Sequence, residues 1–208
     1  MAPPRSDIPR LPDLDLLMET GRLRLRPLTE ADVDALWPIA SDPVLPRQMM
    51  WTAHADRKDT LAFIRETHAW LEDGSALTLA IEHAGVAVGC ISLDAIRWQL
   101  GALRVDRAEL GYWLAPALWG QGFVTEAARA LVQFGFDIVG LHKVSVGCFE
   151  SNIGCRRVIE KVGFQLVGRA LDDVWREGRW ETQLRYELLA RDYSDIMTTM
   201  PIARISQP

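Results

Sequence analysis

The stretch WGQGFVTEA, residues 119–127, places two glycines one residue apart, directly before a segment with helical periodicity. Glycines let the backbone approach a phosphate closely, and a helix N-terminus offers unpaired amides and the positive end of a dipole. The lysine of a nucleotide-binding P-loop is absent, and so is the third glycine of a dinucleotide fold. We expect either an anion-binding turn or a flexible turn before a helix.

A second stretch, ESNIGCRRVIEKVGF at residues 150–164, brings an asparagine and a cysteine to the start of another expected helix. Asn152 suits the N-cap of that helix, where a side-chain oxygen accepts a backbone amide. Cys155 is either a small buried residue, the usual place of a free cysteine, or a group close to a reacting centre.

Glu109 is the strongest candidate for acid–base chemistry. It lies mid-strand in RAELGYWL, on the face opposite Leu110 and Tyr112, where a central strand prefers an apolar residue. A carboxylate in such a position can accept a proton from a substrate. We expect Glu109 to be a proton acceptor or to orient the substrate, and the alternative is a solvated carboxylate on an open sheet face.

The elements that must position these residues follow from hydrophobic periodicity. Alternating arginine and leucine in RLRLR indicate a strand, and apolar residues at three- and four-residue steps indicate helices. We expect strands at 19–28, 77–83, 85–96, 107–114 and 143–149, two more at FQLVG and TQLRYELL separated by the loop DDVWREGRW, and helices at 29–40, 56–72, 124–138 and 153–162.

This order of elements predicts a mixed α/β (α+β) fold, with a twisted, mostly antiparallel sheet of six to seven strands flanked by about four helices. Four prolines among the first thirteen residues indicate an extended arm over 1–18. We expect one catalytic domain over 19–190. Residues 191–208 have no clear periodicity, and we expect them to form a tail or part of a homodimer contact.

Composition excludes several classes of function. The 208 residues are 49% hydrophobic with a net charge of −5, which argues against a nucleic-acid or anionic-membrane binder. Three cysteines without close pairing suggest neither a disulfide framework nor a zinc site, so we expect no metal and a cytoplasmic location. No apolar run of about 18 residues indicates a transmembrane helix.

From Ala108 to Gly168 the sequence resembles the GNAT N-acetyltransferases, and within them the RimJ/RimL-type branch that acetylates N-terminal alanine or serine of ribosomal proteins. The start GRLRLRPLTEADVDAL is similar in outline to the first strand and helix of that branch. The resemblance implies the GNAT fold, with acetyl-CoA as cosubstrate between two splayed central strands.

In this family the pattern Q/R-x-x-G-x-G/A holds the pyrophosphate of acetyl-CoA on backbone amides. Trp119 stands here at the Gln/Arg position, and Val124 replaces a small residue. The resemblance implies that Asn152 bonds the pantetheine arm, with Arg157 one helical turn further, and that Cys155 lies near the thioester sulfur. The implied cofactor-binding residues are Leu114, Trp119, Gly120, Gln121, Gly122, Phe123, Val124, Thr125, Asn152 and Arg157.

One catalytic residue of many GNAT enzymes is missing. Where they carry a tyrosine that protonates the leaving thiolate, this sequence has Ile159. A CoA thiolate has an intrinsic pKa of about 8.5, so protonation assists its departure without being compulsory. A backbone N–H in the segment 113–115 is expected to stabilise the negative charge that develops on the carbonyl oxygen. Glu109 and Cys155 are the catalytic candidates.

The acceptor is the least defined part of the prediction. Trp51 and Trp98 lie in expected loops where this family builds its acceptor cleft, and with Tyr112 they are the candidate acceptor-binding residues. We expect direct transfer of acetyl to a protein or peptide N-terminal amine. Two alternatives stay open: a small amine such as an antibiotic, polyamine or aminoacyl-nucleotide, and a non-catalytic acyl-CoA-binding module.

Overall fold

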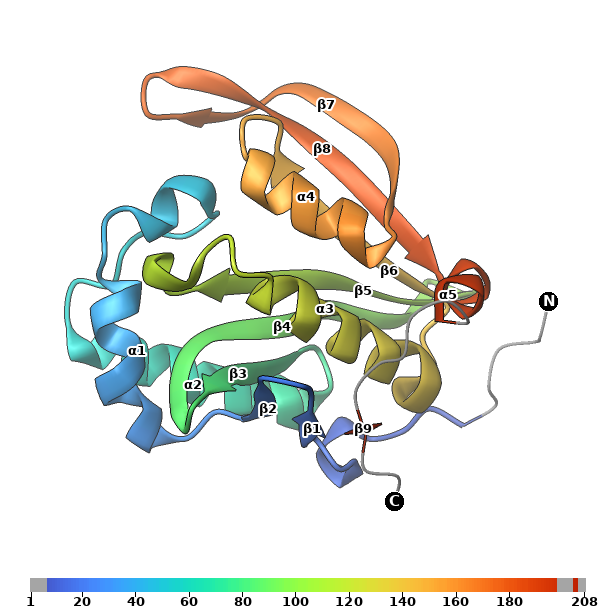
Figure 1. Cartoon of the computed structure of the whole chain (residues 1–208). Coiled ribbons are helices and arrows are strands. Elements are labelled where there is room, and N and C mark those ends of the chain that lie inside the picture. Colours follow the sequence, from blue (N-terminus) through green and yellow to red (C-terminus); the bar gives the residue numbers. More distant parts are fainter. Residues whose placement is uncertain (1–6, 198–203, 206–208) are drawn as a thin grey trace.

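The computed structural model describes residues 7–197 and 204–205, and its centre is a nine-stranded sheet in the order β7-β8-β6-β5-β4-β3-β2-β1-β9 (Figure 1). Neighbouring strands are antiparallel except β5 and β6, which run parallel. The strands are Met18–Glu19, Arg24–Pro27, Leu77–His83, Val86–Leu100, Leu103–Leu114, Lys143–Phe149, Gln165–Arg176, Arg179–Leu189 and Arg204–Ile205, numbered β1 to β9.

Among the described residues, five α-helices accompany the sheet: α1 (Val33–Ala40), α2 (Arg57–Asp73), α3 (Phe123–Phe134), α4 (Ile153–Val162) and α5 (Ala190–Met197). Short 3-10 helices lie at Leu11–Asp13, Glu30–Asp32, Leu45–Gln48 and Pro116–Leu118, and a π-helical turn, Gly135–Val139, extends α3. The predicted mixed, mostly antiparallel sheet is confirmed, with more strands than the six to seven expected. The two-residue strands β1 and β9 are too short to produce a periodic signal.

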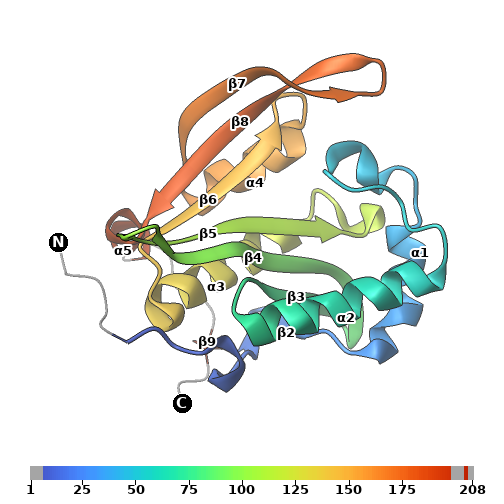
Figure 2. The same ribbon diagram turned by 180° about the vertical axis from the view of Figure 1, so that it is seen from behind.

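Helices cover both faces of the sheet (Figures 1 and 2). One face packs against α3 and α4 around a large core that includes Ile91, Leu110 and Leu131. The other face packs against α1 and α2 around a smaller core that includes Leu36 and Ile64. Successive residues of β5 point to opposite faces, so even-numbered residues face α3 and odd-numbered residues face the side of α1 and α2.

Helix α2 illustrates how local sequence fixes an element. Asp56 accepts a hydrogen bond from the Lys58 amide at 2.5 Å. Asp59 in turn accepts a hydrogen bond from the Asp56 amide, which completes a capping box. Gly74 ends the helix with a φ of 75°, a left-handed conformation that favours glycine. The helix predicted over 56–72 is therefore confirmed almost to the residue.

One expected loop is wrong. The segment DDVWREGRW is the far end of a long β7–β8 hairpin that turns at Glu177–Gly178. A bulge between Ala170 and Val174 interrupts the strand alternation there, which hides the strand from a period-2 pattern. Figure 1 shows this hairpin projecting above α4.

The two terminal segments contribute to the sheet and core. In the segment predicted as an arm, Leu11 and Leu16 are buried in the larger core and Met18 begins β1. Helix α5 (Ala190–Met197) covers the first residues of the segment predicted as a tail, 191–208, and β9 in the same segment pairs with β1. Residues 1–6, 198–203 and 206–208 lie outside the described part.

Candidate active site

The parallel strands β5 and β6 separate in the middle of the sheet. They pair at only three positions, the last being Glu109 with Ser145, and their ribbons then diverge towards Leu114 and Phe149 (Figure 1). Beyond Glu109 the β6-facing edge of β5 is no longer matched by the neighbouring strand. This is the splay that the sequence comparison with the GNAT fold predicts for the acetyl-CoA site.

Glu109 lies at the point where the two strands separate. Its side chain is exposed and points to the face opposite Leu110 and Tyr112, as its position in the strand predicts. Its register partner on β4 is Asp94, and its register partner on β6 is Ser145. Polar residues of three adjacent strands therefore meet on the sheet face that carries α1 and α2.

Asp94 is the acidic residue that the sequence analysis missed. Its carboxylate accepts a hydrogen bond from Ser92 at 2.7 Å and lies directly over Gly111, where a Cβ would come within 2.6 Å of Oδ2. Burial, aided by the charge of Glu109, raises the pKa of Asp94 although the Ser92 hydroxyl opposes this. The sequence signal that could have identified Asp94 is the alternation of polar Ser92 and Asp94 with apolar residues in β4.

A group of two thiols and a phenol lies on the other face. The Tyr112 hydroxyl is 2.9 Å from Cys155 Sγ in the first turn of α4, so this contact links β5 to α4. The Cys148 thiol of β6 interacts with the same sulfur and, against the effect of burial, lowers the pKa of Cys155 with help from Tyr112. Burial and the Cys155 sulfur raise the pKa of Tyr112.

The end of β5 narrows the choice of oxyanion donor. The amide of Ala115 donates to Val88 O of β4 at 2.9 Å. Amides alternate in direction along a strand, so the N–H of Leu114 points the other way, towards β6. Within the predicted segment 113–115, Leu114 is therefore the amide directed into the splay.

The predicted pyrophosphate turn connects β5 to α3. Gly120 and Gly122 have φ values of 76° and 81°, and Gly122 is the N-cap of α3 without a side-chain hydrogen bond to the helix amides. The Trp119 indole donates to Leu114 O at 2.8 Å, and Gln121 donates to Ala117 O at 3.2 Å. Both polar side chains of the turn thus bind backbone carbonyls, and neither caps the first amides of α3.

The remaining predicted cofactor residues lie beside that turn or on α4. Phe123 is buried against the His83 ring, with 4.6 Å between centroids, and Val124 packs partly against the larger core. Thr125 is half-buried in the first turn of α3. Asn152 caps α4 by accepting the amide of Cys155 at 2.9 Å, which confirms the N-cap expectation. Arg157 is exposed on α4.

A contact between the N-terminal strands and α3 was not predicted from the sequence. Glu126 of the first turn of α3 accepts hydrogen bonds from the Thr20 hydroxyl at 2.5 Å and the Arg22 amide at 2.9 Å. It also forms an ion pair with the Arg22 guanidinium at 2.7 Å. Burial would raise the pKa of Glu126, but these hydrogen bonds outweigh it and lower the pKa. RLRLR alone did not reveal this role because it indicates only a strand.

The three predicted acceptor residues do not converge. Trp51 packs edge-on against Trp113 at the end of β5, with ring centroids 6.2 Å apart. Trp98 is not in a loop as expected: it belongs to β4, beside the opposite end of β5, where the Arg104 guanidinium lies 5.9 Å from its ring. Tyr112 faces α4, on the opposite side of the sheet from Trp113. Only Trp51 therefore lies on the same face as Glu109 and near the splay.

The segment around Trp51 is joined to the β7–β8 hairpin. The Arg176 guanidinium donates to the carbonyls of Pro46 and Met49. Trp175 and Trp180 stack near it at the hairpin turn and are 60% and 56% exposed. Exposed aromatic rings and loop backbone therefore border the open end of the splay.

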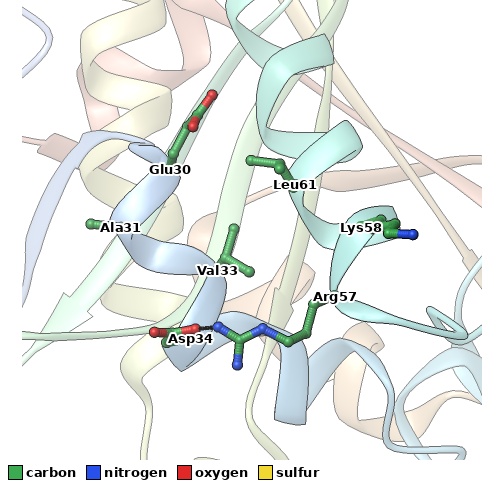
Figure 3. Close-up of a pocket in the computed structure, with 7 residues that line it drawn as sticks. All are labelled: Glu30, Ala31, Val33, Asp34, Arg57, Lys58 and Leu61. Carbon is green, nitrogen blue, oxygen red and sulfur yellow. Dashed lines mark ion pairs between the residues drawn. The ribbon is translucent and has the colours of Figure 1, made fainter.

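A separate pocket of about 340 Å³ lies between α1 and α2 (Figure 3). Its lining residues are Glu30, Ala31, Val33, Asp34, Arg57, Lys58 and Leu61. Asp34 pairs with Arg57, and Glu30 with Arg65. Surface ion pairs border this pocket, and its lining includes none of the residues described above on β5 and β6.

The residues that the structure describes contain no cluster of three or more His, Cys, Asp or Glu side chains able to hold a metal ion. None of their helices is long and apolar enough to cross a membrane.

Comparison with known proteins identifies the family. Residues 22–165 match the family described as "Acetyltransferase (GNAT) domain", which is more than half of the chain. The chain belongs to the GNAT acetyltransferase family. GNAT enzymes are acetyl-CoA-dependent N-acyltransferases, and the splay and the glycine turn lie within the matched residues.

Relatives and solved structures extend this match. The chain is 33% identical over 149 residues, 69% of its length and 78% of the relative's, to YdaF of Bacillus subtilis strain 168, provisionally assigned as a ribosomal N-acetyltransferase. Its fold is similar to RimJ of Mycobacterium smegmatis in complex with CoA-disulfide, with TM-score 0.77, 22% identity and coverage of 91% and 95%. It is also similar to spermidine N-acetyltransferase of Vibrio cholerae in complex with CoA and spermine, with TM-score 0.73, 19% identity and coverage of 84% and 99%.

The GNAT cosubstrate fits the residues present. The positive-φ glycines keep side chains away from the turn before α3, and the cap of α3 leaves its amides available to an anion. The splay of β5 from β6 begins one residue after Glu109. These features fit an extended, anionic cosubstrate such as acetyl-CoA.

Proposed function

We propose that this GNAT enzyme acetylates the N-terminal amine of a protein or peptide. The observation that carries the proposal is the position of Glu109. Its exposed carboxylate lies at the splay, and Asp94 on β4 is its register partner. The amine approaches from the face of α1 and α2, while acetyl-CoA lies against the β6-facing edge of β5. Acetyl-CoA supplies an acetyl thioester.

Glu109 takes the proton from the incoming ammonium, directly or through water, so that the neutral amine attacks the acetyl carbon. The Leu114 amide stabilises the charge that develops on the carbonyl oxygen. The acetyl C–S bond breaks as the C–N bond forms, and the electron pair remains on the CoA sulfur. The new amide nitrogen then loses its second proton to water. Cys155, whose Sγ lies 2.9 Å from the Tyr112 hydroxyl, is the proposed proton source for the CoA sulfur.

For cosubstrate binding we propose that the amides of residues 120–125 hold the diphosphate. Asn152 keeps its NH₂ group for the pantetheine arm, since its oxygen caps α4. Arg157, exposed one turn further, extends that surface. Trp119 and Gln121 shape the turn through their backbone hydrogen bonds.

Two observations favour a peptide over a polyamine. The polar side chains at the splay hold one pair of carboxylates, Asp94 and Glu109, which suits a single ammonium group. Trp51, partly exposed and backed by the buried Trp113, lies on the same face of the sheet, which suits the first side chain of a peptide. The similarity to YdaF agrees with this acceptor. The bound spermine of the Vibrio cholerae enzyme keeps small polyamines as the second candidate.

The test is acetyl-CoA turnover over a panel of amines, read by mass spectrometry. The panel contains peptides that begin with Ser, Ala, Met or Asp, together with spermidine, an aminoglycoside and an aminoacyl-nucleotide. We expect acetylated peptides, with Glu109→Gln as the inactive control. Transfer only to the small amines would replace the peptide proposal with the second candidate. CoA binding without turnover of any panel member would contradict the peptide proposal and support a binding module.

A further inference from the structure

The guanidinium of Arg22 contacts the predicted pyrophosphate turn from a different part of the chain. Arg22 lies between β1 and β2, and its Nη1 donates to Gln121 O at 3.0 Å. Its Cζ is 4.3 Å from the centre of the Phe123 ring. A Cβ on Gly122 would lie 3.6 Å from its Nη2. Arg22 therefore contacts three successive residues where α3 begins.

The turn lacks a positive side chain of its own. No lysine or arginine occurs over residues 117–125. Trp119 stands where the family motif has Gln or Arg, and its indole is directed to Leu114 O. The only charge in the first turn of α3 is the negative one of Glu126. A carboxylate there repels phosphate and weakens the anion site that the helix amides create.

The ion pair of Arg22 with Glu126 changes this balance. Arg22 Nε and Nη2 both reach Glu126 Oε2 at 2.7 Å, and Thr20 fixes the other oxygen. The carboxylate is thereby neutralised and the guanidinium is held in one orientation. A guanidinium has five N–H donors, and Glu126 and Gln121 O engage three of them. The Arg22 side chain is 45% exposed, so the other two are accessible to phosphate oxygens.

We propose that Arg22 is a binding residue for the phosphate groups of acetyl-CoA. From the segment between β1 and β2 it cancels the charge of Glu126 and supplies cationic N–H donors, which residues 117–125 lack. This inference rests on the proposed placement of the diphosphate at residues 120–125. Glu126 is the positioning residue: it orients Arg22, and Arg22 cancels its charge. The bidentate fork of arginine suits phosphate better than lysine would.

The experiment measures the Kd of CoA by calorimetry and the KM and kcat for acetyl-CoA. Charged hydrogen bonds are strong enough that Arg22→Ala should raise both Kd and KM about tenfold or more. We expect kcat at saturation to stay within about twofold, because Arg22 is remote from the transferred acetyl group. Arg24→Ala, an exposed arginine two residues further along the same segment, is the matched control and should leave both values near wild type.

A double variant separates charge from structure. In Arg22→Ala the Glu126 carboxylate faces the phosphates alone, so adding Glu126→Gln should recover part of the lost affinity. If Arg22 were only a structural tie, the two single variants would raise KM equally and the double variant would be no better, and this result overturns the proposal. So does an Arg22→Ala variant that binds CoA as tightly as Arg24→Ala.

Gly122→Ala tests the placement on which the inference rests. A side chain at this left-handed position disturbs the turn, so affinity for CoA should fall if the diphosphate binds there. If Gly122→Ala binds CoA normally and is folded by circular dichroism, the placement of the diphosphate is wrong. If Gly122→Ala weakens binding and Arg22→Ala does not, the placement stands and the role of Arg22 is wrong.

Discussion

Glu109 and Asp94 are register partners on neighbouring strands, yet their surroundings differ. Glu109 is exposed, whereas Asp94 lies over Gly111 with Ser92 as its hydrogen-bond donor. The Glu109 carboxylate is free to meet an incoming ammonium. The more enclosed Asp94 adds negative charge beneath it.

Glu109→Gln tests the proposed base. General-base catalysis contributes about a hundredfold or more, so kcat should fall by about that factor. Stability should change little because Glu109 is exposed. The measurement is turnover of the best peptide of the panel, with thermal unfolding as the control for folding. Turnover within about threefold of wild type would rule out Glu109 as the base.

Asp94→Asn links activity to pH-dependent stability. The pKa of Asp94 is raised by burial and by Glu109, so the folded state favours its protonated form. Ionising it destabilises the fold as pH rises from the ordinary carboxyl pKa through the raised one, and the penalty persists at neutral pH. Asparagine removes that penalty.

We therefore expect Asp94→Asn to unfold at the same or a higher temperature than wild type at pH 7, with the advantage lost at low pH. Its kcat/KM for the amine should fall, since one of the two charges facing the ammonium is gone. Thermal unfolding from pH 3 to 8, together with acceptor kinetics, checks both. A destabilised variant at pH 7 would show that the carboxylate serves the fold.

Helix α4 is the element where capping and cofactor binding overlap. Asn152 Oδ1 accepts the Cys155 amide, and this bond orders the first turn of the helix. The capped residue, Cys155, also places its Sγ beside Tyr112 and Cys148. The position of the Cys155 thiol is therefore tied to the N-cap. A single asparagine thus serves stability through its oxygen and, in our proposal, acetyl-CoA through its nitrogen.

Two substitutions separate these roles. Asn152→Asp keeps an N-cap acceptor and loses the NH₂ donor, so stability should be retained while the KM for acetyl-CoA rises. Asn152→Ala loses both and should also cost about 1 kcal/mol of stability. Chemical denaturation and acetyl-CoA kinetics on both variants provide the check. An unchanged KM in Asn152→Asp would confine Asn152 to capping.

At the scale of the whole molecule, the splay divides the sheet into two parts. Strands β1 to β5 lie on one side of it, and the β6, β7 and β8 strands on the other (Figure 2). On the side of α1, Arg176 joins the two parts by binding the carbonyls of Pro46 and Met49. This contact borders the face where the acceptor is proposed to enter.

Arg176→Ala should therefore affect the acceptor and spare the cosubstrate. Losing the contact releases the segment around Trp51 from the hairpin, so the KM for the amine should rise several-fold, while the KM for acetyl-CoA stays near wild type. Steady-state kinetics with each substrate varied in turn tests this. Arg179→Ala, in the same hairpin and paired only with Glu181 among the ion pairs of the described residues, is the control. Equal effects on both KM values would contradict an acceptor-specific role.

Local sequence determined most of the elements and half of the site. Periodicity and caps placed α2, α4 and the central strands, because those signals act within a few residues. Local sequence patterns also predicted the position of Glu109 on its strand, the N-cap role of Asn152 and the family motif. The bulged hairpin and the two-residue strands were not, because their regularity comes from pairing with distant segments.

Tertiary structure alone decided which residues meet. Asp94 comes to Glu109 through strand register, Tyr112 to Cys155 across the splay, and Arg22 to α3 over about a hundred residues of chain. It also separated Trp98 and Tyr112 from Trp51, which the family resemblance had grouped together as acceptor-binding candidates. Sequence encodes the chemistry that each residue brings, whereas side-chain meetings depend on the register and packing of remote strands, which no local pattern specifies.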